Sequence, residues 1–137
     1  MGSAGSAKVG DEITVCGVDG QIVGTAKYAA PGLNWAVWEV EANGETQWLT
    51  RLEGELYETE TAAGDENGPQ AEGFRLIREG EAQCELEGRT GREFNRRPYK
   101  YWRRDDGGIA VATQSREGWE IVIGRPLDSA LVEVFPA

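Results

Sequence analysis

Hydrophobic and polar residues alternate along most of this chain, and the spacing of an amphipathic helix is nearly absent. In segment 35–41 (WAVWEVE), Ala36, Trp38 and Val40 share one face of the expected strand, and the other four residues share the opposite face. Short strands separated by turn residues are typical of antiparallel barrels and sandwiches. We therefore predict an all-β protein, with strands over 12–18, 21–28, 35–41, 45–52, 55–60, 74–80, 81–88, 99–105, 108–114, 118–124 and 131–135.

Two glycine-containing dipeptides mark hairpin turns. Asp19-Gly20 and Asn43-Gly44 each stand between two alternating segments, and glycine tolerates the positive φ that two-residue hairpin turns require. The one weak helix candidate, residues 126–133 (PLDSALVE), is interpreted as a turn.

A shift of 64 residues lays one part of the chain onto another. Without gaps, segment 35–60 matches segment 99–124 at Trp38 and Trp102, and again at the glycine of the following turn. Each copy reads as an aromatic strand, a glycine turn, a second strand and a Glu-Gly turn into a third. We interpret the pattern as two related antiparallel β-meanders that form a small barrel or a sandwich pair.

The expected domain boundaries follow from this repeat. Residues 1–7 are a flexible N-terminus or a cloning remnant, 8–60 the first meander, 61–73 an acidic linker and 74–137 the second meander. If each meander covers the apolar face of the other, the inward-facing aromatic residues form the core. The tryptophans expected in this structural core are Trp38, Trp48, Trp102 and Trp119.

Four stretches carry a resemblance to a known family. They are residues 9–28 (VGDEITVCGVDGQIVGTAKY), 35–56 (WAVWEVEANGETQWLTRLEGEL), 74–83 (FRLIREGEAQ) and 99–137, which starts YKYW and ends VEVFPA. In their order and spacing they resemble the bacterial domain-of-unknown-function family 4178, over residues 8–137. The resemblance implies an accessory role in a bacterial membrane-stress or conflict-type system, and it implies no catalytic residue.

The net charge of −10 is unevenly distributed. From Glu53 to Glu87, eleven acidic residues stand against two arginines, whereas from Arg89 to Arg104 seven basic residues stand against one acid. We expect the two blocks to lie near each other and partly neutralise. An acidic chain is repelled from nucleic acid and anionic lipid unless its basic block forms a separate face.

The basic block supplies the candidate binding residues. The arginines of segment 89–98 have no counterparts in the first meander, and the arginine fork suits carboxylate or phosphate recognition. We expect the partner to be a protein or a membrane-associated complex. The residues predicted to bind it are Arg89, Arg92, Arg96, Arg97 and Tyr99.

Two alternatives involve nucleic acid. Segment 92–104 interleaves arginines with aromatic residues, as grooves for single strands do, although alternate residues of a strand over 99–104 must point inward. The acidic residues of the middle segment could instead mimic nucleic acid and block a DNA-binding enzyme, although the linker holds several of them.

Catalytic and metal-binding chemistry find little support in the residues. The chain has no histidine, the most common general base and metal ligand. The stretches DDGG and GDENG do not have the ligand spacing of a calcium loop, and the chain has no glycine-rich phosphate-binding motif. We predict a non-enzymatic interaction module without a cofactor or a metal.

The two cysteines indicate the cellular compartment in which the protein is expected. Cys16 and Cys84 do not have metal-ligand spacing, and we expect both to be free thiols of a cytoplasmic protein. No apolar run approaches the roughly 20 residues of a membrane-spanning helix, and the opening MGSAGSA lacks the apolar centre of a signal peptide.

Overall fold

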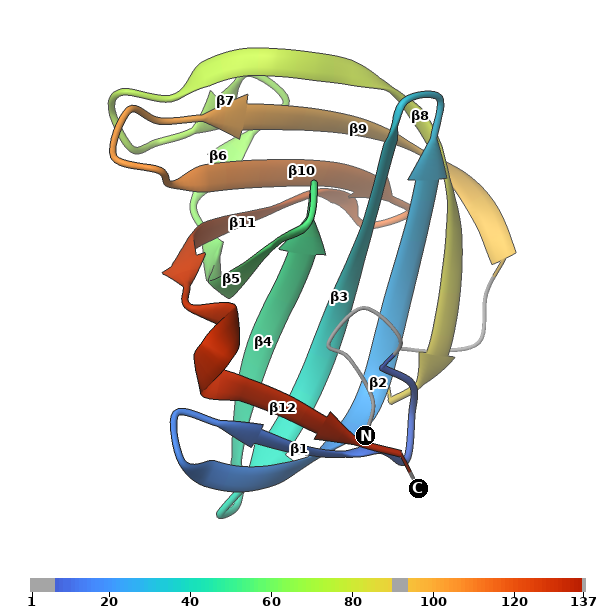
Figure 1. Cartoon of the computed structure of the whole chain (residues 1–137). Coiled ribbons are helices and arrows are strands. Elements are labelled where there is room, and N and C mark those ends of the chain that lie inside the picture. The colour runs from blue at the N-terminus through green and yellow to red at the C-terminus, as the bar shows by residue number, and fades with distance from the viewer. Residues whose placement is uncertain (1–6, 90–93, 137) are drawn as a thin grey trace.

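The computed structural model describes residues 7–89 and 94–136, and most of them form β-strands (Figure 1). This confirms the predicted all-β class. In this part of the chain, no helix is long and apolar enough to cross a membrane. The elements are β1 (Glu12–Val15), β2 (Val18–Ala30), β3 (Leu33–Ala42), β4 (Glu45–Leu52), β5 (Glu55–Ala62), β6 (Gly64–Asp65), β7 (Gly68–Pro69), β8 (Arg75–Gly88), β9 (Phe94–Arg103), β10 (Ile109–Ser115), β11 (Gly118–Leu127), the 3-10 turn η2 (Ser129–Leu131) and β12 (Val132–Phe135).

Eight of the strands form a closed ring in which neighbours are antiparallel (Figure 1). The order around the ring is β2, β3, β4, β5, β11, β10, β9 and β8, and β8 pairs back with β2. Along the edge of β2, residues 18–21 pair with β1 and residues 24–29 pair with β8. Closure leaves fewer strand edges open to another chain.

Each predicted meander supplies four strands of the ring, β2–β5 from the first and β8–β11 from the second. The two meet at two seams, where β5 pairs with β11 and β2 pairs with β8. Each seam joins strands that hold the same place in the two meanders. The two halves therefore enclose one common interior.

The repeat preserves the order of the strands but not their register. Trp38 of β3 pairs with Leu49, whereas Trp102 of β9 pairs with Ala110. A strict 64-residue repeat would place Trp102 opposite Thr113 instead. The loop between β9 and β10 is longer than the Asn43-Gly44 turn, which explains how the register can differ.

The hairpin turns agree with the sequence at one predicted position and differ at the other. Asn43 and Gly44 form the predicted turn with φ values of 54° and 78°. The Asp19-Gly20 prediction is wrong, because the β1–β2 turn is Cys16-Gly17, with φ values of 51° and 83°. A Cβ atom on Gly20 would lie 2.9 Å from the carbonyl oxygen of Glu41, so this glycine permits close strand approach instead.

Two layers cover the outside of the ring. On one side, apolar residues of β1 and β12 form a buried cluster with Trp38, Val40 and Leu49. On the other side, residues 61–73, predicted to be a linker, complete β5 and then form β6 and β7, which contact β10 and β11. A second buried cluster lies beneath this segment. Trp102 belongs to it, and Trp119 is half-buried against it.

The interior of the ring is filled at one end by aromatic side chains. The rings of Tyr28 and Trp35 stack with centroids 4.6 Å apart, and the centroids of Trp35 and Tyr99 lie 5.0 Å apart with the rings tilted by 52°. Leu52, Tyr57, Tyr101 and Ile109 belong to the same buried cluster. This aromatic cluster fills one end of the interior.

Candidate functional site

A cavity of about 290 Å³ lies inside the ring, beside the aromatic cluster. It is the candidate site because every strand of the ring contributes to its wall. An eight-stranded closed sheet has an interior that side chains just fill, or that holds one small ligand. The wall residues, one from each strand in chain order, are Ala26, Val37, Thr50, Thr59, Leu86, Arg97, Val111 and Val122.

The alternation of each strand explains why these residues face the cavity. In β3, Trp35 and Val37 belong to the interior, whereas Trp38 belongs to the outer cluster. In β10, Val111 lies opposite Val122 of β11 on the interior side. Short side chains at these positions leave the central space open.

A pair of threonines forms one polar part of the wall. The hydroxyl groups of Thr50 and Thr59 lie 3.3 Å apart, and the Thr59 hydroxyl also donates to the carbonyl oxygen of Trp48 at 3.2 Å. Both threonines are buried. Buried hydroxyls need such partners, because an unsatisfied polar group in an apolar interior is costly.

A second polar part of the wall contains Tyr28, Thr113 and Arg97. Burial raises the pKa of Tyr28, and Cys84 adds to this effect, whereas Arg97 and Thr113 act in the opposite direction. The phenol of Tyr28 therefore stays protonated at neutral pH. Arg97 lines the cavity together with Tyr28 and Thr113.

Trp48 lies at the rim of the cavity and is 37% exposed. It was expected in the structural core, and the structure corrects that expectation. Its side chain shares the interior face of β4 with Thr50, but it lies four residues along the strand from Leu52, the residue of β4 that belongs to the aromatic cluster. Trp38 and Trp102, by contrast, are only 1% and 5% exposed.

Arg89, a predicted partner-binding residue, is engaged within the protein. Its Nε atom lies 2.6 Å from a carboxylate oxygen of Glu39, and its Nη1 atom lies 2.6 Å from one of Glu41. The remaining nitrogen donates to the hydroxyl of Thr46 at 3.2 Å. Glu39 and Glu41 raise the pKa of Arg89, so this arginine fastens the end of β8 to β3 and β4.

The other predicted partner-binding residues do not share one surface. Arg96 is exposed, and the adjacent Arg97 lines the cavity because neighbouring residues of a strand point to opposite sides. Tyr99 is 3% exposed and packs on Trp35. Arg92 lies outside the described residues. Partner binding through Arg96 stays a prediction.

The aromatic residues described in β9 are poorly placed to stack on nucleic-acid bases. Tyr99 and Tyr101 are buried inside the ring, and Trp102 is buried beneath the 61–73 segment. Stacking on bases requires exposed rings along a groove. These three aromatic side chains therefore belong to buried clusters inside and outside the ring.

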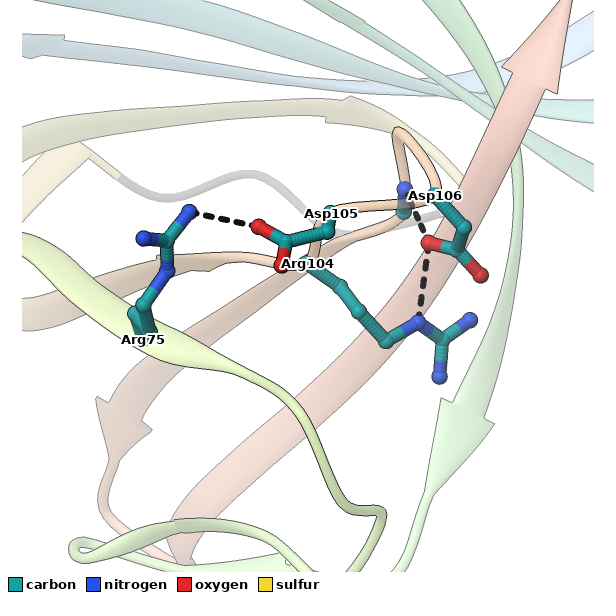
Figure 2. A network of polar contacts seen from close by, with 5 residues as sticks. Arg75, Arg104, Asp105 and Asp106 are labelled. Atoms are coloured by element: carbon teal, nitrogen blue, oxygen red, sulfur yellow. Dashed lines mark hydrogen bonds and ion pairs between the residues drawn. The ribbon is translucent and has the colours of Figure 1, made fainter.

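The DDGG stretch forms the loop between β9 and β10 (Figure 2). One carboxylate oxygen of Asp106 accepts hydrogen bonds from Nε of Arg104 and from the backbone N–H of Gly108, both at 2.9 Å. Arg104 and then Gly108 lower the pKa of Asp106. Asp105 forms an ion pair with Arg75 at 2.7 Å, which joins the loop to the start of β8 (Figure 2). Within the described ranges, no cluster of three or more acidic or cysteine side chains could hold a metal ion.

Sequence reasoning missed the cavity. Its walls combine aliphatic, aromatic, hydroxyl and charged side chains spread over eight strands, and no motif connects them. The one local indication was the polar residue type at interior positions, since Thr50, Thr59 and Thr113 stand where strands usually place larger apolar residues. The sequence alone does not show which positions face the interior, because that depends on how the strands pair into the closed ring.

Comparison with known proteins identifies one match. The model of a family described as "Domain of unknown function (DUF4178)" matches residues 8–129, which is most of the chain. No curated protein and no solved structure matches the chain.

Proposed function

Because the chain belongs to this family (DUF4178), whose description assigns no function, we propose from the geometry that it is a non-enzymatic binding module for one small molecule. The observation that carries this proposal is the 290 Å³ cavity to which all eight ring strands contribute. Small-molecule sites are concave, largely apolar and supplied with a few polar groups. The cavity has this composition, because valines and aromatic rings surround two groups of hydroxyls and one arginine.

The non-enzymatic part of the proposal is supported by the residue types. The sequence contains no histidine, and Cys84 is buried with no exposed surface. Tyr28, the phenol that lines the cavity, has its pKa raised, so it is protonated at neutral pH and cannot accept a proton as a phenolate. These groups suit binding better than proton transfer.

The cysteines support a reducing compartment, and we propose the cytoplasm. Both Cys16 and Cys84 are free thiols, as expected from their spacing, with Cys16 exposed and Cys84 buried. An exposed thiol persists in reduced form where cellular reductants keep it so.

The test is a screen by two-dimensional NMR with small molecules of about ten non-hydrogen atoms, which is the size the cavity admits. We expect binders to shift the methyl signals of Val37 and Val111, because these side chains form opposite walls. Replacing Val122 by Phe fills the cavity and should weaken binding at least tenfold.

The matched control is Gln83→Phe, which adds the same ring to an exposed position of β8 that does not line the cavity, and should leave binding unchanged. If no molecule moves the interior methyl signals, or if Val122→Phe binds as well as the unaltered protein, the proposed function is wrong.

A further inference from the structure

We infer that the molecule held in the cavity is a compact amphipathic monocarboxylate, with its apolar body among the interior valines and its carboxylate at Arg97. The inference rests on the proposed function and adds the chemical class of the ligand. It depends on the position of Arg97, on the apolar walls of the cavity and on the volume of the cavity.

Arg97 stands where the cavity meets the surface. It lines the cavity, and it also lines a hollow outside it, which it shares with Leu86 and Glu120. Among the described wall residues, it is the one Lys or Arg. A guanidinium has five N–H donors in a planar fork, so it can bind both oxygens of a carboxylate and keep other contacts within the protein.

The hydroxyl groups near Arg97 fit a negatively charged ligand group. Tyr28 and Thr113 both line the cavity with Arg97, and Thr113 acts to lower the pKa of Tyr28 against the effect of burial. Because the phenol keeps its proton, it adds no negative charge beside a bound carboxylate. Hydroxyls in such a place can donate to an oxyanion or hold a water molecule that does so.

The remaining walls require an apolar body. Ala26, Val37, Val111 and Val122 provide aliphatic surface around the space. A second charged group placed among them would lose its hydration without gaining a partner. A cavity of about 150 Å³ can hold benzene, so one of 290 Å³ has room for a ligand of roughly ten non-hydrogen atoms.

Two carboxylates at the rim oppose an anionic ligand. Glu60 and Glu120 line the cavity, but both are exposed, and water and salt screen exposed charges strongly. Arg97 is half-buried, where its interaction with a ligand charge is screened less. The arginine should therefore outweigh the two carboxylates, and an amine that pairs with them is the alternative to test.

The experiment compares octanoate, 1-octanol and octylamine by isothermal titration calorimetry at about 0.15 M salt and below their aggregation concentrations. The three probes share one aliphatic chain and differ in the charge of the head group. We expect octanoate to bind at least tenfold more tightly than 1-octanol, and octylamine to bind most weakly.

Arg97→Gln should lower the affinity for octanoate by about 10- to 100-fold and leave that for 1-octanol unchanged, because a charge-assisted hydrogen bond is lost. The control is Arg75→Gln, which makes the same charge change on an exposed residue of β8 that lines neither the cavity nor the hollow beside it, and should alter the affinity less than twofold. Arg97→Lys keeps the charge without the planar fork and should bind octanoate at an intermediate strength, which provides a second test if the Gln variant does not fold.

The possible failures are distinct. Equal affinities for octanoate and 1-octanol, unaffected by either Arg97 variant, would overturn the carboxylate assignment and leave small-molecule binding in place. Tightest binding of octylamine would assign the site to amines that pair with Glu60 and Glu120. If none of the three binds and the NMR screen also finds no ligand, the proposed function itself fails.

Discussion

Trp38 and Trp48 belong to neighbouring strands of one hairpin, yet their side chains meet different surroundings. Trp38 points outward from the ring into the cluster that β1 and β12 cover, whereas Trp48 stands at the rim of the interior. Strand alternation decides on which face of the sheet each tryptophan lies. The distance from the aromatic cluster inside the ring decides how much of an interior side chain such as Trp48 is buried. Residue type alone could not separate the two.

We predict that Trp38→Ala lowers the free energy of unfolding by about 3–5 kcal/mol, because it empties a fully buried site. Trp48→Ala should cost about 1 kcal/mol or less, since much of its surface is already in water. Urea unfolding of both variants measures the difference. Similar losses for the two would mean that the rim is packed more tightly than the exposure of Trp48 indicates.

At the scale of strands and turns, three hairpins use the same kind of turn with different first residues. The dipeptides Cys16-Gly17, Asn43-Gly44 and Glu53-Gly54 all have positive φ at both positions. Asparagine adopts this conformation more readily than cysteine or glutamate does. Asp19-Gly20 has a typical turn sequence but lies within β2, where Gly20 is needed because the backbone of β3 approaches closely.

We predict that Cys16→Asn stabilises the protein by about 0.5–1 kcal/mol, because it relieves the backbone strain of a non-glycine residue at positive φ. The converse variant, Asn43→Cys, should destabilise it by a similar amount. Thermal unfolding in the presence of reductant measures both. A loss of stability in Cys16→Asn would show that the cysteine side chain makes a contact that outweighs the strain.

The sequence predicted strands well and the site poorly, for a physical reason. Alternation and turn residues are local, so they placed most of the strands. The predicted strands 74–80 and 81–88 are nevertheless the single strand β8, and β9 begins five residues before the predicted start at 99. Recognition of a partner by Arg97 stays a prediction, and its place in the cavity wall depends on the ring closing through the β2–β8 and β5–β11 pairings. Thr50 and Thr59 meet only because β4 and β5 pair in a particular register.

At the scale of the whole molecule, the two seams make each meander dependent on the other. Without the second half, β2 and β5 would each present an unpaired edge, and the aromatic cluster would lose Tyr99, Tyr101 and Ile109. A sheet of four strands with an open apolar face is a poor independent unit.

We predict that fragments 1–73 and 74–137 do not fold separately but fold together when mixed in equal amounts. The dispersion of amide signals in NMR spectra measures this directly. A dispersed spectrum from either fragment alone would contradict the prediction and would make that half a domain in its own right.

The closing seam also has a consequence during protein synthesis. Ala29 of β2 pairs with Gln83 of β8, which lies 54 residues later in the chain. At about 5–20 residues per second, a ribosome needs roughly 3–10 seconds to add those residues. For that time, the edge of β2 is available to any other nascent strand. A cell that makes this protein rapidly should therefore rely on a chaperone to shield that edge until β8 emerges.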